Sequence, residues 1–321
     1  MISEDKVLSA ADDPFVGDKA SQDEAYTDWE GLGRSRPIES NWHRAWRRFR
    51  ANRVALIALI LLVAIFLFAI LAPLVSHFTG FSYSENHLAD KLSKPGENGY
   101  ILGSDGNGRD ILTRLAYGGR VSLLVAGLAT ASLIVLGGLI GSASGYFGGL
   151  VDTVLMRSAD VLLSIPVLVL LILVSSFFHP APWELALLIA AVSWPGISRL
   201  VRGEVISLKN REFIEASRVI GASNGRIIIR HLMPNVIPTI IVWSSLAIPG
   251  LILTEATLSY LGLGVQAPQP SWGNMLQESK QFVRQSWTFV FFPGFMIFIT
   301  ALCAYLVGLG LRDALDPRLN N

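Results

Sequence analysis

The residues that decide the fold class lie at 54–75 and read VALIALILLVAIFLFAILAPLV. This run has no charged residue, and as a helix it is long enough to cross a hydrocarbon core of about 30 Å, which takes roughly 20 residues. The rest of the chain agrees, because 51% of its residues are hydrophobic and 16% are charged, whereas an ordinary soluble domain has about 25% charged residues. We therefore expect an all-α, polytopic membrane protein.

Five more apolar runs predict a bundle of six transmembrane helices. They cover residues 121–146, 161–178, 182–198, 236–254 and 286–311, and the run at 182–198 depends most on its flanks. The second run contains a glycine at every fourth position, Gly137, Gly141 and Gly145, with Gly149 beyond its end. Such a stripe predicts close packing against another helix of the same subunit rather than a pore lining.

Basic residues predict the orientation, because short cytoplasmic loops are enriched in Lys and Arg. Five arginines lie between residues 44 and 53, and seven basic residues lie between 199 and 230. Six crossings place both clusters and both termini in the cytoplasm. Residues 1–40 are acidic and lack apolar periodicity, so they are expected to form a disordered cytoplasmic tail.

Several classes of function are disfavoured. The net charge of +1 indicates no nucleic-acid partner, and the single cysteine, Cys303, excludes an intrachain disulfide and a cysteine metal cluster. The spans contain few acidic residues, which argues against a proton-coupled transporter. The chain has no GxxxxGK[ST] phosphate loop, no HExxH pair and no evident Ser, His, Asp constellation. We therefore expect no metal site, no cofactor and no catalytic residues, and active transport would need a partner that binds ATP.

The charged stretch at 213–235, FIEASRVIGASNGRIIIRHLMPN, interrupts this apolar sequence. Gly221 would end a first short helix, Ser223 would cap a second, and Pro234 would begin the fifth span. The first helix is expected to have an apolar face formed by Phe213, Ala216 and Ile220. Its charged face would be formed by Arg211, Glu215 and Arg218, which are spaced for intrahelical ion pairs. This elbow is either an interfacial helix on the membrane or a docking site for a soluble partner.

The same stretch resembles the EAA loop of ATP-binding-cassette importer permeases. Glu215, Ala216, Ser217 and Gly221 match the loop at its spacing, with Ser217 in place of the second alanine, and Pro234 closes it. The residues RHLMPN at 230–235 match the form found in peptide transporters. The stretches at 102–126, 258–276 and 310–319 extend the resemblance. From about residue 40 onward the chain resembles the second inner-membrane subunit of oligopeptide and dipeptide permeases.

This resemblance implies a type I ABC importer permease in the bacterial inner membrane. Its expected partners are a homologous permease, two cytoplasmic ATPases that bind the ATP, and an extracytoplasmic peptide-binding protein. It implies a basic segment and first span at 41–76, an external loop at 77–119, and a permease core at 120–321 with a coupling loop at 203–235. Expected ATPase-coupling residues are Glu215, Ala216, Ser217, Arg218, Gly221 and Ala222, and candidates for an external gate are Gly262, Gly264 and Trp272.

Two questions stay open at this point. Permeases of the same type carry nickel, glutathione or antimicrobial peptides, so the resemblance leaves the substrate undecided. A secondary transporter driven by an ion gradient, or a membrane scaffold or enzyme that moves nothing, remains as an alternative in a different class. Copurifying ATPases and a sister permease would support only the importer.

Overall fold

The computed structural model describes residues 41–178 and 180–315. Within these ranges the regular structure is helical, apart from an isolated antiparallel bridge between Ser104 and Asp110. The chain divides by its internal contacts into residues 1–44 and 45–321, and the second unit is the one described below. The predicted acidic tail at 1–40 lies outside the described residues.

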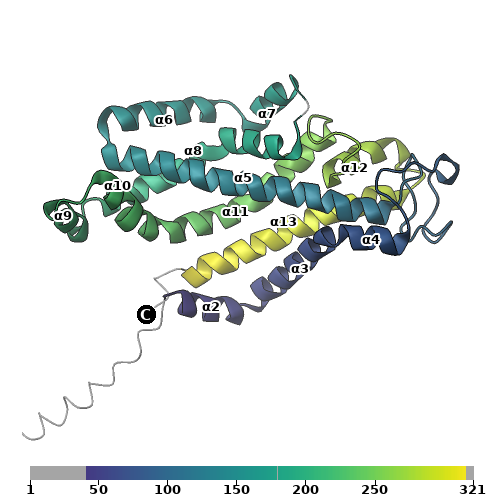
Figure 1. Ribbon diagram of the computed structural model, residues 1–321, viewed down its shortest axis with the longest axis horizontal. Helices are drawn as coiled ribbons and strands as arrows, with labels where there is room; N and C mark the ends of the chain where they lie inside the picture. Colours follow the sequence, from purple (N-terminus) through teal and green to yellow (C-terminus); the bar gives the residue numbers. More distant parts are fainter. Residues whose placement is uncertain (1–40, 179, 316–321) are drawn as a thin grey trace, which may run out of the picture. The chain divides into compact units, whose positions relative to one another are not determined.

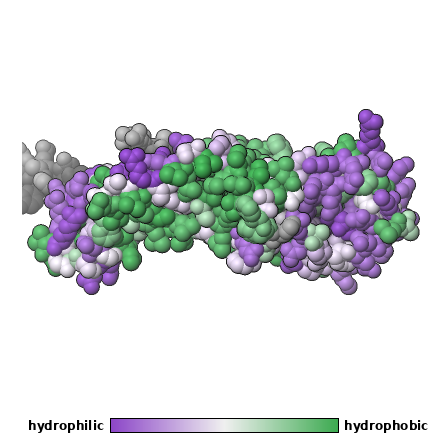
Figure 2. Space-filling view, turned by 90° about the horizontal axis from the view of Figure 1, so that it is seen from above, coloured by the Kyte–Doolittle hydropathy of each residue, from purple (hydrophilic) through white to green (hydrophobic). Residues whose placement is uncertain are grey.

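Five of the described helices are long and apolar enough to cross a membrane. They are α3 (Arg53–Ile70), α5 (Ile111–Phe147), α8 (Pro182–Leu208), α11 (Met233–Tyr260) and α13 (Trp287–Leu315). Helix α5 packs along α8, and α11 packs along α13, which also contacts α3 (Figure 1). Hydrophobic residues gather over the middle of these helices, with hydrophilic residues toward both ends (Figure 2). The predicted all-α, polytopic fold is confirmed.

Four of the shorter helices lie at the two ends of the long ones, while α6 runs alongside α5 and α8 (Figure 1). Helices α9 and α10 are at one end, and α4 and α12 are at the other (Figure 1). The short α-helices are α2 (Asn41–Ala51), α4 (Ala72–Thr79), α6 (Gly149–Ser164), α7 (Val167–Ser175), α9 (Glu212–Val219), α10 (Asn224–Ile227) and α12 (Trp272–Ser279). A π-helical turn (Ile228–Leu232) joins α10 to α11, and 3-10 turns cover Leu88–Asp90 and Lys280–Phe282.

The predicted third span at 161–178 is not one helix. Helix α6 ends at Ser164, and α7 begins at Val167 after a bend of 85°. Pro166 lies at the break, where it cannot donate a helical hydrogen bond and disfavours helical geometry at the residue before it. By length and composition, residues 41–178 and 180–315 therefore contain five candidate spans, or six if the bent pair of α6 and α7 counts as one.

Other boundaries also differ from those predicted. The first predicted span at 54–75 is interrupted, because α3 ends at Ile70 and α4 begins at Ala72. Helix α5 begins at Ile111, inside the predicted external loop, because the Asp110 carboxylate accepts a bond from the Thr113 N–H at 2.7 Å and caps the helix. Helix α8 continues to Leu208, inside the predicted coupling loop at 203–235. In the extension of α5, the buried Arg114 pairs with Asp105 and Glu278, so its charge is compatible with a position inside the helix.

The glycine stripe on α5 is a packing surface for α8, as the sequence predicts. A Cβ atom added at Gly141 would lie 2.5 Å from the Ser198 carbonyl oxygen and 2.7 Å from Val201 Cβ. At Gly145 it would lie 2.9 Å from the Arg202 carbonyl oxygen. The stripe ends there, because Gly149 has a φ of +54° and begins α6. These glycines allow the two backbones to approach at the end of α5 that carries the elbow.

Candidate functional site

The elbow, defined here as residues 211–232, consists of two short helices joined by a glycine turn. Gly221 has a φ of +85°, which glycine adopts without steric cost. Its N–H donates to the Arg218 carbonyl oxygen at 2.9 Å, and the Ala222 N–H donates to the Ser217 carbonyl oxygen at 3.0 Å. This pair of bonds is a Schellman motif, so Gly221 ends α9 as the sequence predicts.

The second half of the elbow leads directly into a span. Ser223 is the N-cap residue of α10, as predicted, and has an extended conformation, but its side chain makes no capping hydrogen bond. The π-helical turn then connects α10 to α11, and Pro234 lies in the first turn of that helix. Helix α11 begins beside Pro234, whereas the candidate span extends back without a break to Asn224. A displacement of α10 would therefore act on α11 through continuous helical backbone.

The buried face of α9 is not the predicted one. Ile214 is 0% exposed and belongs to a cluster with Ile227 and Leu232. The residues predicted for the apolar face, Phe213, Ala216 and Ile220, are instead exposed. Val219 at 88% and Ile220 at 86% are among the most exposed apolar side chains of the described chain. An eight-residue helix with apolar residues on several sides has no periodicity that identifies its buried face.

The charged side of α9 is free of the predicted ion pairs. Among the described residues, Glu215 forms no salt bridge with Arg211 or Arg218, and its side chain is exposed. The Arg218 guanidinium instead lies over the ring of Tyr146, with 5.6 Å from its carbon to the ring centroid. The carboxylate of Glu215 is therefore available to a partner outside the subunit. The small residues beside it are Ala216, which is exposed, and Ser217, which is partly exposed.

Tyr146 connects the elbow to the end of α5. Its hydroxyl donates to the Asn224 side-chain oxygen at 2.8 Å, while its ring contacts Arg218 on α9. Nearby, the Lys209 ammonium donates to the Gly145 carbonyl oxygen at 2.9 Å. The sequence pattern does not predict this role for Tyr146, although a tyrosine at the end of an otherwise apolar run is a signal. These contacts join α9, α10 and α5 into one unit.

Ion pairs join α6 to α8 at the same end of the bundle. Arg202 Nη2 lies 2.6 Å from Asp152 Oδ2, and Ser144 Oγ also donates to this carboxylate. Asp160 pairs with Arg199 of α8 and with Arg157, the latter at 3.7 Å. The basic residues that indicate a cytoplasmic segment thus also hold α6 against the bundle.

At the opposite end, the loop after α11 is shaped by two glycines. Gly262 has a φ of +80°. A Cβ atom at Gly264 would lie 2.2 Å from Ser259 Oγ and 2.7 Å from the Ser259 backbone. Both of these gate candidates therefore occupy positions that require glycine.

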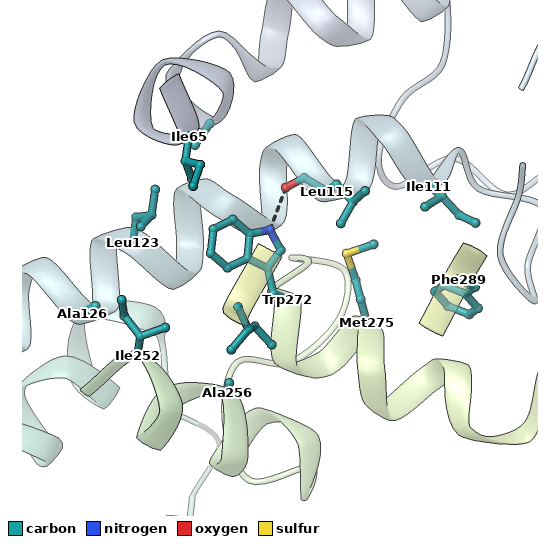
Figure 3. Packing of buried hydrophobic residues seen from close by; sticks show 12 residues of the cluster. Ile65, Ile111, Leu115, Leu123, Ala126, Ile252, Ala256, Trp272, Met275 and Phe289 are labelled. Atoms are coloured by element: carbon teal, nitrogen blue, oxygen red, sulfur yellow. Dashed lines mark hydrogen bonds between the residues drawn. The ribbon is translucent and has the colours of Figure 1, made fainter. Parts of the chain in front are cut away.

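Trp272, the third gate candidate, belongs to the core. Its side chain is 0% exposed, and its Nε1–H donates to the Leu115 carbonyl oxygen at 3.0 Å. It packs among residues of α3, α5, α11 and α12, including Ile65, Leu123 and Met275 (Figure 3). Trp272 therefore positions α12 and does not itself form part of an exposed surface.

The start of α12 is held by a buried polar network. Ser271 caps the helix by accepting from the Asn274 N–H at 3.2 Å, and the Asn274 side chain accepts from the Ser271 N–H at 2.8 Å. Ser122 accepts from the Trp272 N–H at 3.2 Å and donates to Glu255 at 2.9 Å. Glu255 is buried and also accepts from Ser259 at 2.8 Å. Three helices, α5, α11 and α12, thus meet at one carboxyl group.

An ion cluster fastens the loop before α5 to the other end of α12. Arg109 donates to Asp105 at 2.7 Å and to Glu278 at 2.6 Å, and Arg114 donates to both carboxylates. Arg114 is 1% exposed, so its charge depends on these partners. Sequence analysis missed this cluster, since Arg114 and Glu278 are 164 residues apart. Burial raises the pKa of Tyr100, in the same loop, to about 12.

The described residues offer no site for a metal ion, since no three or more of their His, Cys, Asp or Glu side chains come together to hold one. The two ends of the bundle therefore differ in kind. One presents an exposed elbow with an unpaired carboxylate, and the other presents a loop in which Arg109 and Arg114 pair with Asp105 and Glu278. The exposed end has the properties of a docking site.

Comparison with known proteins identifies the family of the chain. Residues 134–321 match the family described as the binding-protein-dependent transport system inner membrane component, and residues 40–95 match the N-terminal transmembrane domain of oligopeptide transport permease C. The chain is 44% identical over 281 residues to the oligopeptide transport system permease protein OppC of Escherichia coli, which covers 87% of this chain and 92% of that one.

Two further relatives have similar sequence identity and coverage. The dipeptide transport system permease protein DppC of Alkalihalophilus pseudofirmus is 40% identical over 283 residues, covering 88% of this chain and 91% of its own. OppC of Bacillus subtilis is 40% identical over 281 residues, covering 87% of this chain and 90% of its own. The chain therefore belongs to the family of binding-protein-dependent transport system inner membrane components, as a multi-pass permease subunit of an ABC transporter.

Proposed function

We propose that this chain is the second permease subunit of an ATP-driven importer for oligopeptides or dipeptides. Its relatives named above are oligopeptide and dipeptide permeases. A homologous permease pairs with it to form the translocation path, an extracytoplasmic binding protein delivers the peptide, and two cytoplasmic ATPases supply the energy. The subunit itself catalyses no reaction and binds no cofactor.

The main structural support for this proposal is the exposed surface of the elbow. Glu215 has no ion-pair partner among the described residues, and the apolar side chains of Val219 and Ile220 beside it are almost fully exposed. An exposed apolar surface next to an unpaired charge is typical of a protein interface. The elbow is nevertheless anchored by Ile214 and Tyr146. It combines an accessible surface with a firm attachment to the spans, which a coupling element requires.

The proposed mechanism is alternating access. ATP closes the ATPase dimer, and the elbows of both permeases move with it. In this subunit the motion reaches α11 through the π-helical turn and α5 through Tyr146. The spans then tilt from an inward-open to an outward-open arrangement. Glu215 pairs with a basic ATPase residue, while Ala216 and Ser217 allow the surfaces to approach closely.

Affinity purification followed by reconstitution tests this function. The tagged subunit should copurify with a sister permease and ATPases, and proteoliposomes containing the complex and binding protein should import labelled peptide only with ATP. A secondary transporter would instead copurify without ATPases and lose uptake when an ionophore dissipates the ion gradient. Competition by nickel or glutathione, but not by peptides, would contradict the proposed substrate.

We further propose that both termini and the elbow are cytoplasmic, on the basis of the basic clusters. In a Cys303→Ala background, cysteines at Asn98 and Gln269, both exposed at the opposite end, should react with an impermeant thiol reagent in intact cells. A cysteine at Asn224 on the elbow should react only after the cells are lysed. Labelling of position 224 in intact cells would reverse the proposed orientation.

A further inference from the structure

An apolar groove runs between α3, α5, α11 and α13. It consists of two adjoining cavities of about 290 and 430 Å³, which share the lining residues Phe66, Leu123 and Gly127. The first cavity extends along α5 to Ile134, and the second reaches Arg120. From Arg120 to Ile134 an α-helix rises about 21 Å, which exceeds the roughly 15 Å of hydrocarbon in one leaflet of a bilayer. The groove therefore has the length of an acyl chain.

The walls of the groove offer no free hydroxyl donor. Three hydroxyl residues line it, and each donates to a carbonyl of its own helix: Thr130 to Ala126 at 2.7 Å, Ser245 to Val242 at 2.7 Å, and Thr300 to Met296 at 2.6 Å. The other lining residues of this cavity are apolar. A ligand in this part of the groove must therefore be apolar as well.

The groove contains open space beside Gly127. A Cβ atom added there would meet no atom within 4 Å, although on the same helix a Cβ at Gly119, Gly137 or Gly141 would meet a neighbour within 3 Å. Gly127 lies in both cavities, so the open space continues from one to the other. A larger side chain at this position would fill the groove without disturbing the packing of the subunit.

Arg120 places a positive charge at one end of the groove, at the boundary of the membrane. It is exposed, and the neighbouring Gly119 lies beside Ala69 near the last residue of the apolar helix α3. Its guanidinium carbon is 5.5 Å from the ring centroid of Tyr117, and aromatic residues are enriched at this depth. Arg120 forms no salt bridge with any acidic residue of the described chain.

We propose that this groove binds a glycerophospholipid, with its phosphate at Arg120 and one acyl chain beside Gly127. The combination of a cationic mouth and an apolar channel matches both parts of that molecule. An apolar helix of the sister permease has no reason to require the positive charge, and the carboxylate of a transported peptide would use the charge but would leave the apolar channel unfilled. The experiment distinguishes these occupants.

Photolabelling of the full-length subunit, purified with the subunits that accompany it, tests the proposal. The probe is phosphatidylglycerol carrying a diazirine on one acyl chain, in mixed vesicles of phosphatidylethanolamine and phosphatidylglycerol. Mass spectrometry should locate adducts in α5 between Leu123 and Ile134. Gly127→Leu should lower their yield about tenfold, because the added side chain occupies the space of the acyl chain.

Two variants complete the design. Gly250→Leu adds the same side chain at an equally open helical glycine outside the groove, and it should label like the wild type. Arg120→Gln should reduce adducts of the phosphatidylglycerol probe by about two- to fivefold, the range for an exposed ion pair, without reducing those of a diazirine diacylglycerol.

Three outcomes would overturn the proposal. Undiminished labelling of folded Gly127→Leu would show that lipid does not enter the groove. Labelling of the isolated subunit but not of the assembled complex would assign the groove to the sister permease. Loss of labelling on addition of excess peptide would assign it to the transported substrate. None of these readouts requires that the complex transports peptide, so the lipid site and the proposed function fail separately.

Discussion

Replacing Glu215 with Lys is expected to abolish transport while leaving the subunit folded and inserted. The side chain is exposed and has no salt bridge among the described residues, so reversing its charge removes no ion pair from the subunit. At an interface with an ATPase the same change would bring like charges together in a partly desolvated contact, which costs roughly 2 to 5 kcal/mol. The effect on docking should therefore far exceed the effect on folding.

Uptake of labelled peptide and copurification of the ATPases should both be measured for this variant. We expect uptake to fall to background, with ATPases lost from the complex or hydrolysing ATP without transport, while the sister permease remains bound. Asp313→Lys is a matched control, because Asp313 is also exposed and lies in the last turn of α13. Lys in the last turn of a helix is favourable, so this reversal should be tolerated.

A compensating change makes the test specific. An acidic residue in place of the basic ATPase residue that faces position 215 should restore part of the uptake of Glu215→Lys. If Glu215→Lys imports peptide at the wild-type rate with its ATPases bound, the docking role proposed for the elbow is wrong.

Trp272→Ala is expected to cause the largest loss of stability. The side chain is completely buried, its ring lies against Gly119 of α5, and its Nε1–H bond to Leu115 would be lost. Truncation of a buried Trp typically costs about 3 to 5 kcal/mol, a large part of the stability of most domains. We expect a strongly lowered unfolding midpoint in detergent and reduced amounts of the subunit in the membrane.

Trp287→Ala provides the matched control for the truncation. This tryptophan is 63% exposed at the start of α13, so its removal should change the free energy of unfolding by no more than about 0.5 kcal/mol. Trp272→Phe should have an intermediate effect, since it keeps most of the buried ring and loses the N–H. If the Trp272→Ala subunit is as stable as the wild type but loaded binding protein no longer stimulates ATP hydrolysis by the complex, Trp272 acts in the external gate and not in the core.

Local sequence determined where most of the membrane-spanning helices lie and where the elbow turns. An uncharged run such as 54–75 must become a helix in lipid, because every backbone polar group there has to be paired within the segment. Gly221 ends α9 because its positive φ suits glycine, and the glycine spacing on α5 indicates a close helix contact wherever the partner lies. These properties depend on residues within a few turns of each other.

Tertiary structure alone decided which surfaces are buried. The sequence of α9 contains apolar residues on more than one side, and only the packing of Ile214 against α10 and α11 left Val219 and Ile220 exposed. The sequence around Trp272 predicts a position in an external gate, whereas in the folded subunit residues of α3, α5 and α11 bury this side chain. The pairing of Arg114 with Glu278 joins residues 164 positions apart. Burial and ion pairing across such distances depend on how the helices assemble, and a pattern that repeats every 3.6 residues carries no information about that assembly.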